Sequence, residues 1–182
     1  MTFITYIFIY IFIIYINIIL CIKEIIIHHD NFDNIKNIIK DNQDDDELII
    51  KFIENYYNMT YLDYDTDITV LSKITIIGNE NGTIFDYDNK RKGVLNVIFT
   101  DAGEKNKYLN IYNIIFKNFM DKKIVYYGIN IMKLITHSDR FFFTLSNCKF
   151  QNNYGNIFYL ISQCSKSTHE EPSIVFNNCS FE

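Results

Sequence analysis

The sequence of 182 residues contains no tryptophan, one proline and six glycines. A single proline excludes proline-rich linkers and collagen-like stretches, and without Trp no binding cage of indole rings can form. Basic residues are few as well: 17 Lys and Arg stand against 22 Asp and Glu, giving a formal net charge of -5. Because no basic field is available to attract phosphates, nucleic acid is not an expected partner. Hydrophobic residues make up 48% of the chain, enough for one domain with a sizeable core.

The amino-terminal segment, residues 2–22, is uncharged and strongly apolar. Its length suits a membrane-spanning helix and exceeds the roughly 7–15 residues of a usual signal-peptide core, but no small-residue cleavage site follows. Residues 1–27 are therefore either a cleaved signal peptide or a retained signal anchor. Acidic residues dominate the stretch that follows, which favours placing the rest outside the cell. The predicted location is extracellular or cell-surface, or in the membrane if the segment is retained.

Residues 28–47 read as a polar linker with one short amphipathic helix. Ile35, Ile38 and Ile39 have the spacing of a helix face, Asn31 or Asp33 can cap its amino end, and Lys40 suits its last turn. This segment is expected to be a capping helix. The acidic run at 44–47 lacks the glycine and the alternating ligands of a calcium loop, so a solvated linker is the better interpretation.

Three sequons and four cysteines bear on the compartment. Asn58, Asn81 and Asn178 each begin an N-x-S/T motif and are candidate glycosylation sites, which agrees with an outside location. Outside the apolar segment the cysteines are at 148, 164 and 179, an odd number that allows at most one disulfide. No Cys or His pair has the spacing of a zinc site, so we expect no metal and no cofactor.

Beyond residue 47 the helical period disappears, and short β-branched or aromatic runs alternate with Asn, Asp, Gly and Ser. This pattern is typical of strands and turns, and it predicts an all-β domain over residues 48–182. The expected strands are 48–52, 68–71, 74–77, 83–85, 94–99, 109–111, 114–116, 124–127, 142–145, 148–150, 157–161, 174–176 and 179–181.

An internal repeat suggests how these strands are arranged. Residues 109–116, 143–150 and 174–181 each contain a short apolar strand, then Asn, an apolar residue or Cys, any residue, and Phe. We call this motif the Asn-h-x-Phe repeat, where h is an apolar residue or Cys and x is any residue. If each unit is one turn of a solenoid, Asn113, Asn147 and Asn178 occupy corners where Asn tolerates the left-handed conformation. Asn side chains stacked about 4.8 Å apart can then hydrogen-bond from rung to rung.

The residues after each corner are expected to face the core. By the period of two along a strand, the apolar residue after the Asn and the Phe two positions later share one face. Like residues then stack on like in successive rungs. The expected core ladder consists of Cys148, Cys179, Phe116, Phe150 and Phe181.

On these motifs the chain resembles the right-handed parallel β-helix of the pectate-lyase-like superfamily, and it looks like an amino-terminal portion of such a protein. Residues 31–52 resemble the superfamily's helical cap and first strand, and residues 72–85, with Gly78 at the corner, are similar to an early rung. The resemblance implies a solenoid preceded by a short amphipathic capping helix and by the hydrophobic segment. The resemblance also implies what an enzyme of this kind would need. A lyase would hold calcium with acidic side chains, and a hydrolase would use grouped aspartates as acid and base.

The weak catalytic candidates are Asp86 and Asp88, which would share a strand face if residues 83–88 stay extended, with Arg91 close by. The alternative is that residues 88–93 form an ordinary charged turn. Calcium would be needed only if the chain is a lyase. The charged turn, which ends at Gly93, is the favoured interpretation.

The favoured function is a secreted or surface-tethered, non-catalytic β-helix that contacts polysaccharide or cell-surface glycans. Tyr56, Tyr57, Tyr61 and Tyr64 could stack on sugar rings. One alternative is a fragment of a polysaccharide lyase or glycoside hydrolase with catalytic rungs missing; another is a membrane-anchored protein of unknown role. Because the sequence stops just after the third repeat, we expect a truncated domain and an open carboxyl-terminal rung that could self-associate.

Overall fold

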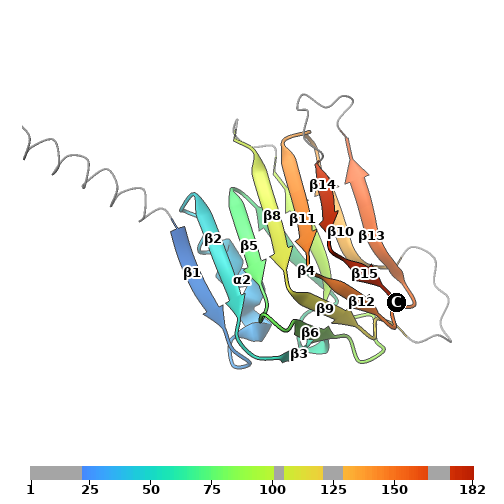
Figure 1. Ribbon diagram of the computed structural model, residues 1–182. Helices are drawn as coiled ribbons and strands as arrows, with labels where there is room; N and C mark the ends of the chain where they lie inside the picture. The colour runs from blue at the N-terminus through green and yellow to red at the C-terminus, as the bar shows by residue number, and fades with distance from the viewer. Residues whose placement is uncertain (1–21, 101–104, 121–128, 164–172) are drawn as a thin grey trace, which may run out of the picture.

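The computed structural model describes residues 22–100, 105–120, 129–163 and 173–182, which form three parallel β-sheets (Figure 1). The first sheet, sheet A, contains β1 (Ile22–Ile27), β2 (Glu47–Phe52), β5 (Lys73–Ile77), β8 (Lys107–Tyr112), β11 (Phe141–Ser146) and β14 (Ile174–Asn177), in that order. Sheet B contains β3 (Tyr56–Asn58), β6 (Thr83–Asp86), β9 (Ile114–Lys117), β12 (Lys149–Gln151) and β15 (Ser180–Phe181). Sheet C contains β4 (Asp65–Val70), β7 (Val94–Phe99), β10 (Asn130–Thr136) and β13 (Asn156–Ser162). The prediction of a mainly β structure is confirmed, and all described strand pairs are parallel.

The chain enters the three sheets in rotation. From β2 onward, each strand of sheet A is followed by one of sheet B, and the chain then reaches sheet C before it returns to sheet A one strand further along. The register keeps equivalent residues side by side: Ile50 pairs with Ile25 on one neighbour and with Ile76 on the other. Each circuit of the chain therefore adds one strand to each sheet, and the apolar pattern of one strand lies directly against that of the next.

The core lies between the three sheets and is built from the alternate, inward-facing side chains. Aromatic residues stack along it from strand to strand. The ring centroids of Phe116 and Phe150 are 4.8 Å apart and the ring planes are nearly parallel, at 10°; those of Phe150 and Phe181 are 5.1 Å apart at 6°. Cys148, Phe116 and Phe150 are all buried. This part of the core therefore has the inward, stacked arrangement that the Asn-h-x-Phe repeat predicts.

The amphipathic segment forms a 3-10 turn, η1 (Phe32–Asn34), followed by α2 (Ile35–Lys40). Phe32, Ile35 and Ile39 are buried, and α2 packs against β4, at one end of the molecule (Figure 1). The prediction that the side chain of Asn31 or Asp33 caps this helix is wrong. Asn34 precedes α2 without a capping bond, and Asn31 instead accepts from the His28 amide at 2.8 Å and donates to the Ile26 carbonyl at 3.2 Å.

Three strands were not predicted: β1, β3 and β10. The sequence predicts that residues 22–27 belong to the amino-terminal hydrophobic segment, whereas in the structure Ile22–Ile27 is the edge strand of sheet A, paired with β2. In β10, Lys133 interrupts the apolar run and hides the strand signal. Residues 1–21 and the strand expected at 124–127 lie outside the described residues. Within the described ranges, no helix is long and apolar enough to cross a membrane.

The end of the molecule formed by β13, β14 and β15 carries exposed apolar side chains. Phe181 is 53% exposed and Phe176 46% exposed, although Phe181 was expected in the core. Phe181 has a stacking partner, Phe150, on one face only, which explains why half of its surface is accessible. A second short 3-10 turn, η2 (Met59–Tyr61), follows β3 near the opposite end.

Candidate functional site

The candidate site begins with three corners between sheets A and B. Asn113 follows β8, Asn147 follows β11 and Asn178 follows β14, and each stands immediately before the chain turns into a strand of sheet B. Their φ angles are 58°, 54° and 51°, the left-handed region that Asn tolerates better than most residues. These are the corner positions that the repeat indicates, and they place three identical side chains in one row.

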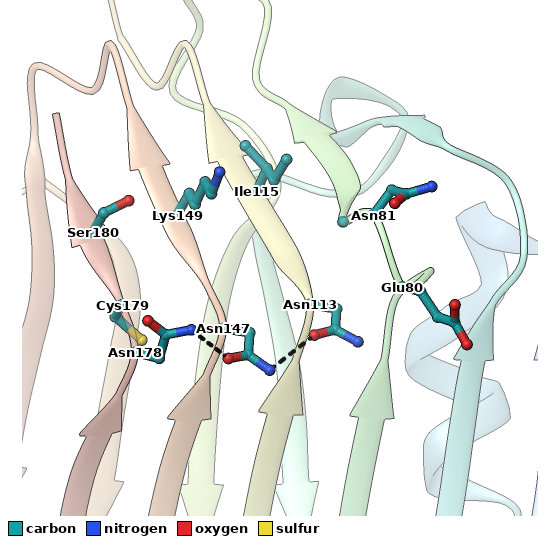
Figure 2. Close-up of a pocket in the computed structure, with 10 residues that line it drawn as sticks. Glu80, Asn81, Asn113, Ile115, Asn147, Lys149, Asn178, Cys179 and Ser180 are labelled. Carbon is teal, nitrogen blue, oxygen red and sulfur yellow. Dashed lines mark hydrogen bonds between the residues drawn. The ribbon is translucent and has the colours of Figure 1, made fainter.

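The three side chains form a hydrogen-bonded ladder (Figure 2). The amide nitrogen of Asn147 donates to the side-chain oxygen of Asn113 at 3.3 Å, and that of Asn178 donates to the side-chain oxygen of Asn147 at 2.8 Å. All the donors therefore point the same way along the row. Because an amide group has two N–H donors and an oxygen with two lone pairs, Asn147 keeps one of each for another partner.

Backbone hydrogen bonds hold these corners against one another. The Asn113 amide donates to the Ser146 carbonyl at 3.1 Å, and the Asn147 amide donates to the Asn177 carbonyl at 2.9 Å. Close packing continues toward the previous turn of the chain, where a Cβ atom on Gly78 would lie 2.4 Å from the Asn113 carbonyl oxygen. The ladder is thus built on a backbone that has little freedom to move.

The ladder forms one wall of a pocket of about 350 Å³, which we call the Asn groove. The residues that line it are Glu80, Asn81, Gly82, Asn113, Ile115, Asn147, Lys149, Asn178, Cys179 and Ser180. A second row lies beside the ladder, two residues after each corner, because Ile115, Lys149 and Ser180 are paired in register on β9, β12 and β15 (Figure 2). The groove therefore runs across the strands, and its amide and second rows repeat once per strand.

Charges in the Asn groove are few and of both signs. Lys149 and Glu80 are exposed, and among the described residues neither forms an ion pair. In Figure 2, Lys149 stands beside the ladder, and Glu80 lies beyond Asn113, toward the opposite end of the groove from Asn178. A pocket of this kind offers hydrogen bonds rather than a strong field of one sign.

The two cysteines of the repeat are free thiols in the structure. Cys148 is buried, and its sulfur lies 3.6 Å from the Ile111 carbonyl and 3.5 Å from the Ser146 carbonyl. Burial raises the pKa of the Cys148 thiol to about 11, so at neutral pH the group is protonated and a poor nucleophile. Cys179 is partly buried, and its sulfur lies 3.5 Å from the Leu145 carbonyl.

The acidic candidates form a turn and not a shared strand face. β6 ends at Asp86, and Asp88 and Asn89 have positive φ angles of 49° and 57°, so the extended stretch that the hypothesis needs is missing. The Asp86 carboxylate accepts from the Asp88 amide at 2.9 Å, and the Lys90 amide closes the turn on the Tyr87 carbonyl at 2.8 Å. The shared strand face is therefore absent, and the structure has the turn that the sequence favours, because the left-handed Asp88 and Asn89 turn the chain two residues after Asp86.

Arg91 lies elsewhere. Its guanidinium is 4.0 Å from Asp65, and both residues line a second pocket of about 170 Å³ beside sheet C, together with Asn96, Lys133 and Tyr159. In the part of the chain that the structure describes, no group of three or more His, Cys, Asp and Glu side chains is placed to hold a metal ion.

Two of the three sequon asparagines belong to the Asn groove. Asn81 is exposed at one end, and Asn178 is the exposed last member of the ladder. Asn58 is different, because its side-chain oxygen accepts from the Thr60 amide at 2.9 Å and from the Thr60 hydroxyl at 2.7 Å. A glycan on Asn81 or Asn178 would therefore occupy the same space as a ligand.

The clustered tyrosines divide into two groups. Tyr56, Tyr61 and Tyr64 are exposed. Tyr57 is buried, so the prediction that it stacks on sugar rings is wrong. Its hydroxyl donates to the Ile27 carbonyl at 2.6 Å and to the Glu54 carboxylate. Burial and the contact with Glu54 raise the pKa of Tyr57 far above its ordinary value.

A second set of left-handed asparagines escaped the sequence analysis. Asn118 and Asn152 have φ angles of 58° and 54° and follow β9 and β12, each five residues after a corner of the ladder. The Asn118 side chain donates to Asp86 at 3.0 Å. The signal was present, since both Asn-h-x-Phe motifs continue with one more residue and another Asn.

Comparison of the chain with protein-family models, with curated proteins and with solved structures gave no match.

Proposed function

We propose that this chain is a right-handed parallel β-helix, secreted or tethered at the cell surface, which binds carbohydrate through the Asn groove and has no catalytic role of its own. The rotation of the chain through three parallel sheets supports the solenoid. The resemblance to pectate-lyase-like β-helices in the repeat and the capping helix agrees with it.

The single observation that carries the function is the row of amide side chains in an open pocket. Sugar hydroxyl groups donate and accept hydrogen bonds, and amides held in a fixed orientation offer both partners without a cost in side-chain entropy. Asn147 is exposed even though its neighbours on both sides hold it. It is therefore ordered and accessible at once, which is what a binding group requires.

Binding of polysaccharides to the full-length chain tests the proposal, and the structure supplies a matched pair of variants. Asn147→Gly removes one ladder amide and keeps a residue that accepts a positive φ, whereas Asn152→Gly makes the same change at a corner outside the groove. We expect Asn147→Gly to weaken glycan binding about tenfold or more, since two or more hydrogen bonds are lost, and Asn152→Gly to leave it unchanged. Equal effects of the two variants, or no binding to any glycan, would refute the function.

Self-association is a separate proposal for the end formed by β13, β14 and β15. The exposed Phe176 and Phe181 support it, because paired copies would cover these rings. Sedimentation of the full-length chain over a range of concentrations measures it directly, and a single monomeric species throughout would rule it out.

A further inference from the structure

We infer that the Asn groove holds an extended, uncharged, β-1,4-linked polysaccharide chain that crosses the strands, with one sugar unit beside each asparagine of the ladder. This inference rests on the proposed function and specifies the ligand of the same pocket. It concerns the class of glycan, its direction and the number of sugar units that the pocket recognises.

The direction follows from the way in which the groove repeats. Neighbouring parallel strands lie about 4.8 Å apart, and each of the three strands β9, β12 and β15 follows one ladder asparagine. One unit of an extended β-1,4-linked chain advances by nearly the same distance, and although successive units are turned over, each carries hydroxyl groups on both edges. A chain that crosses the strands therefore presents hydroxyl groups to each asparagine, whereas a chain along the strands would meet only one of them.

The hydrogen-bonding groups suit hydroxyls at each step. Within the ladder, Asn147 uses one N–H toward Asn113 and accepts one bond from Asn178, which leaves one donor and one lone pair per rung. A sugar hydroxyl donates and accepts at the same time, so it can satisfy both groups. Because the corner backbone is held by its own hydrogen bonds, these amides need no rearrangement when the ligand binds.

The second row and the charges point to an uncharged chain. Ile115 offers an apolar contact for a ring face and Lys149 offers a cation, whereas the Ser180 hydroxyl oxygen beside them is buried and has no hydrogen-bond partner among the described residues. A polysaccharide with an acid on every unit would gain from Lys149 but would meet the carboxylate of Glu80 in the same pocket. A neutral chain meets no such repulsion and can still accept a hydrogen bond from the lysine.

Calorimetric titration of the full-length chain with cello-oligosaccharides of one to six glucose units tests the inference. We expect the affinity to rise about five- to tenfold for each unit up to three, because each new sugar gains a hydrogen bond to one more rung, and then to level off. Asn147→Gly should remove most of this rise, and Asn152→Gly should retain it. If Asn147→Gly does not fold, Asn178→Gly breaks only the last ladder bond and should end the rise at two units.

Two results would overturn the inference and leave the proposed function standing. If glucose binds as tightly as cellotriose, the pocket recognises a single sugar unit. Trigalacturonate that binds more tightly than cellotriose would mean that the pocket selects acidic chains. If no oligosaccharide of either class binds, the proposed function itself fails.

Discussion

Phe150 is the residue at which the stacked core can be tested most sharply. It is 1% exposed and lies between two nearly parallel rings, Phe116 at 4.8 Å and Phe181 at 5.1 Å, with the ring of Phe158 at 5.7 Å on its edge. Replacing it by Ala removes a buried ring and breaks contacts on three sides. Phe181 belongs to the same stack but is 53% exposed, so it provides a matched control.

The expected costs differ by a clear margin. A Phe→Ala change in a closed core lowers the free energy of unfolding by about 3–5 kcal/mol in total. Because Phe150 loses three aromatic contacts, we expect Phe150→Ala to lie in the upper part of that range, at about 4–5 kcal/mol. Phe181 has only about half of its surface buried and leaves no closed cavity, so Phe181→Ala should cost about 1.5–2 kcal/mol.

Urea unfolding of the full-length chain, followed by circular dichroism because the chain lacks Trp, measures both values. The midpoints should be independent of protein concentration for a monomer. Equal losses for the two variants would refute the half-exposed position of Phe181. If the Phe181 loss also grew with protein concentration, a second copy covering the end of the stack would be the reason.

Three further predictions concern a corner, a thiol and a carboxylate. Gly78→Ala should destabilise the fold by more than 1 kcal/mol in urea unfolding, since its Cβ would lie 2.4 Å from the Asn113 carbonyl oxygen; no loss would contradict this close approach. Burial raises the pKa of Cys148 from 9.0 to about 11, so the unfolded chain loses this proton first, and stability should fall between pH 9 and pH 11 in the wild type but not in Cys148→Ala. The pKa of Glu54 lies below its usual 4.5, because the bond from Tyr57, the carboxylate's own backbone amide and a nearby His outweigh desolvation. Its contribution should be present above pH 4.5 and lost as the pH falls through that lower pKa, a dependence that is reduced in Glu54→Gln.

The corner asparagines show what the sequence can predict in a fold of this kind. Asn113, Asn147 and Asn178 stand out because one residue type recurs after an apolar run, and the structure places all three at positive φ and links them by hydrogen bonds. The rule is local: an αL corner favours Asn, Asp or Gly, whatever the rest of the chain does. Asn118 and Asn152 follow the same rule, but they lie just beyond the ends of the repeats at residues 116 and 150.

Features that depend on distant residues were harder to predict. The strand β1 is rich in Ile, like the hydrophobic segment before it, and only its partner β2 makes it part of sheet A. The Asn groove itself includes Glu80 and Asn81 from one turn of the chain and Lys149 from another, and no local pattern connects them.

The ladder gives the Asn groove a length that changes only in whole steps. Each corner depends on its immediate neighbours, with Asn147 held by Asn113 on one side and Asn178 on the other. Duplication or loss of one circuit, 31 or 34 residues between successive corners in this chain, would add or remove one amide and leave the rest of the row in register. A gene segment of that size would therefore change the stretch of the proposed ligand that the groove contacts by a single unit, without any change in the existing contacts.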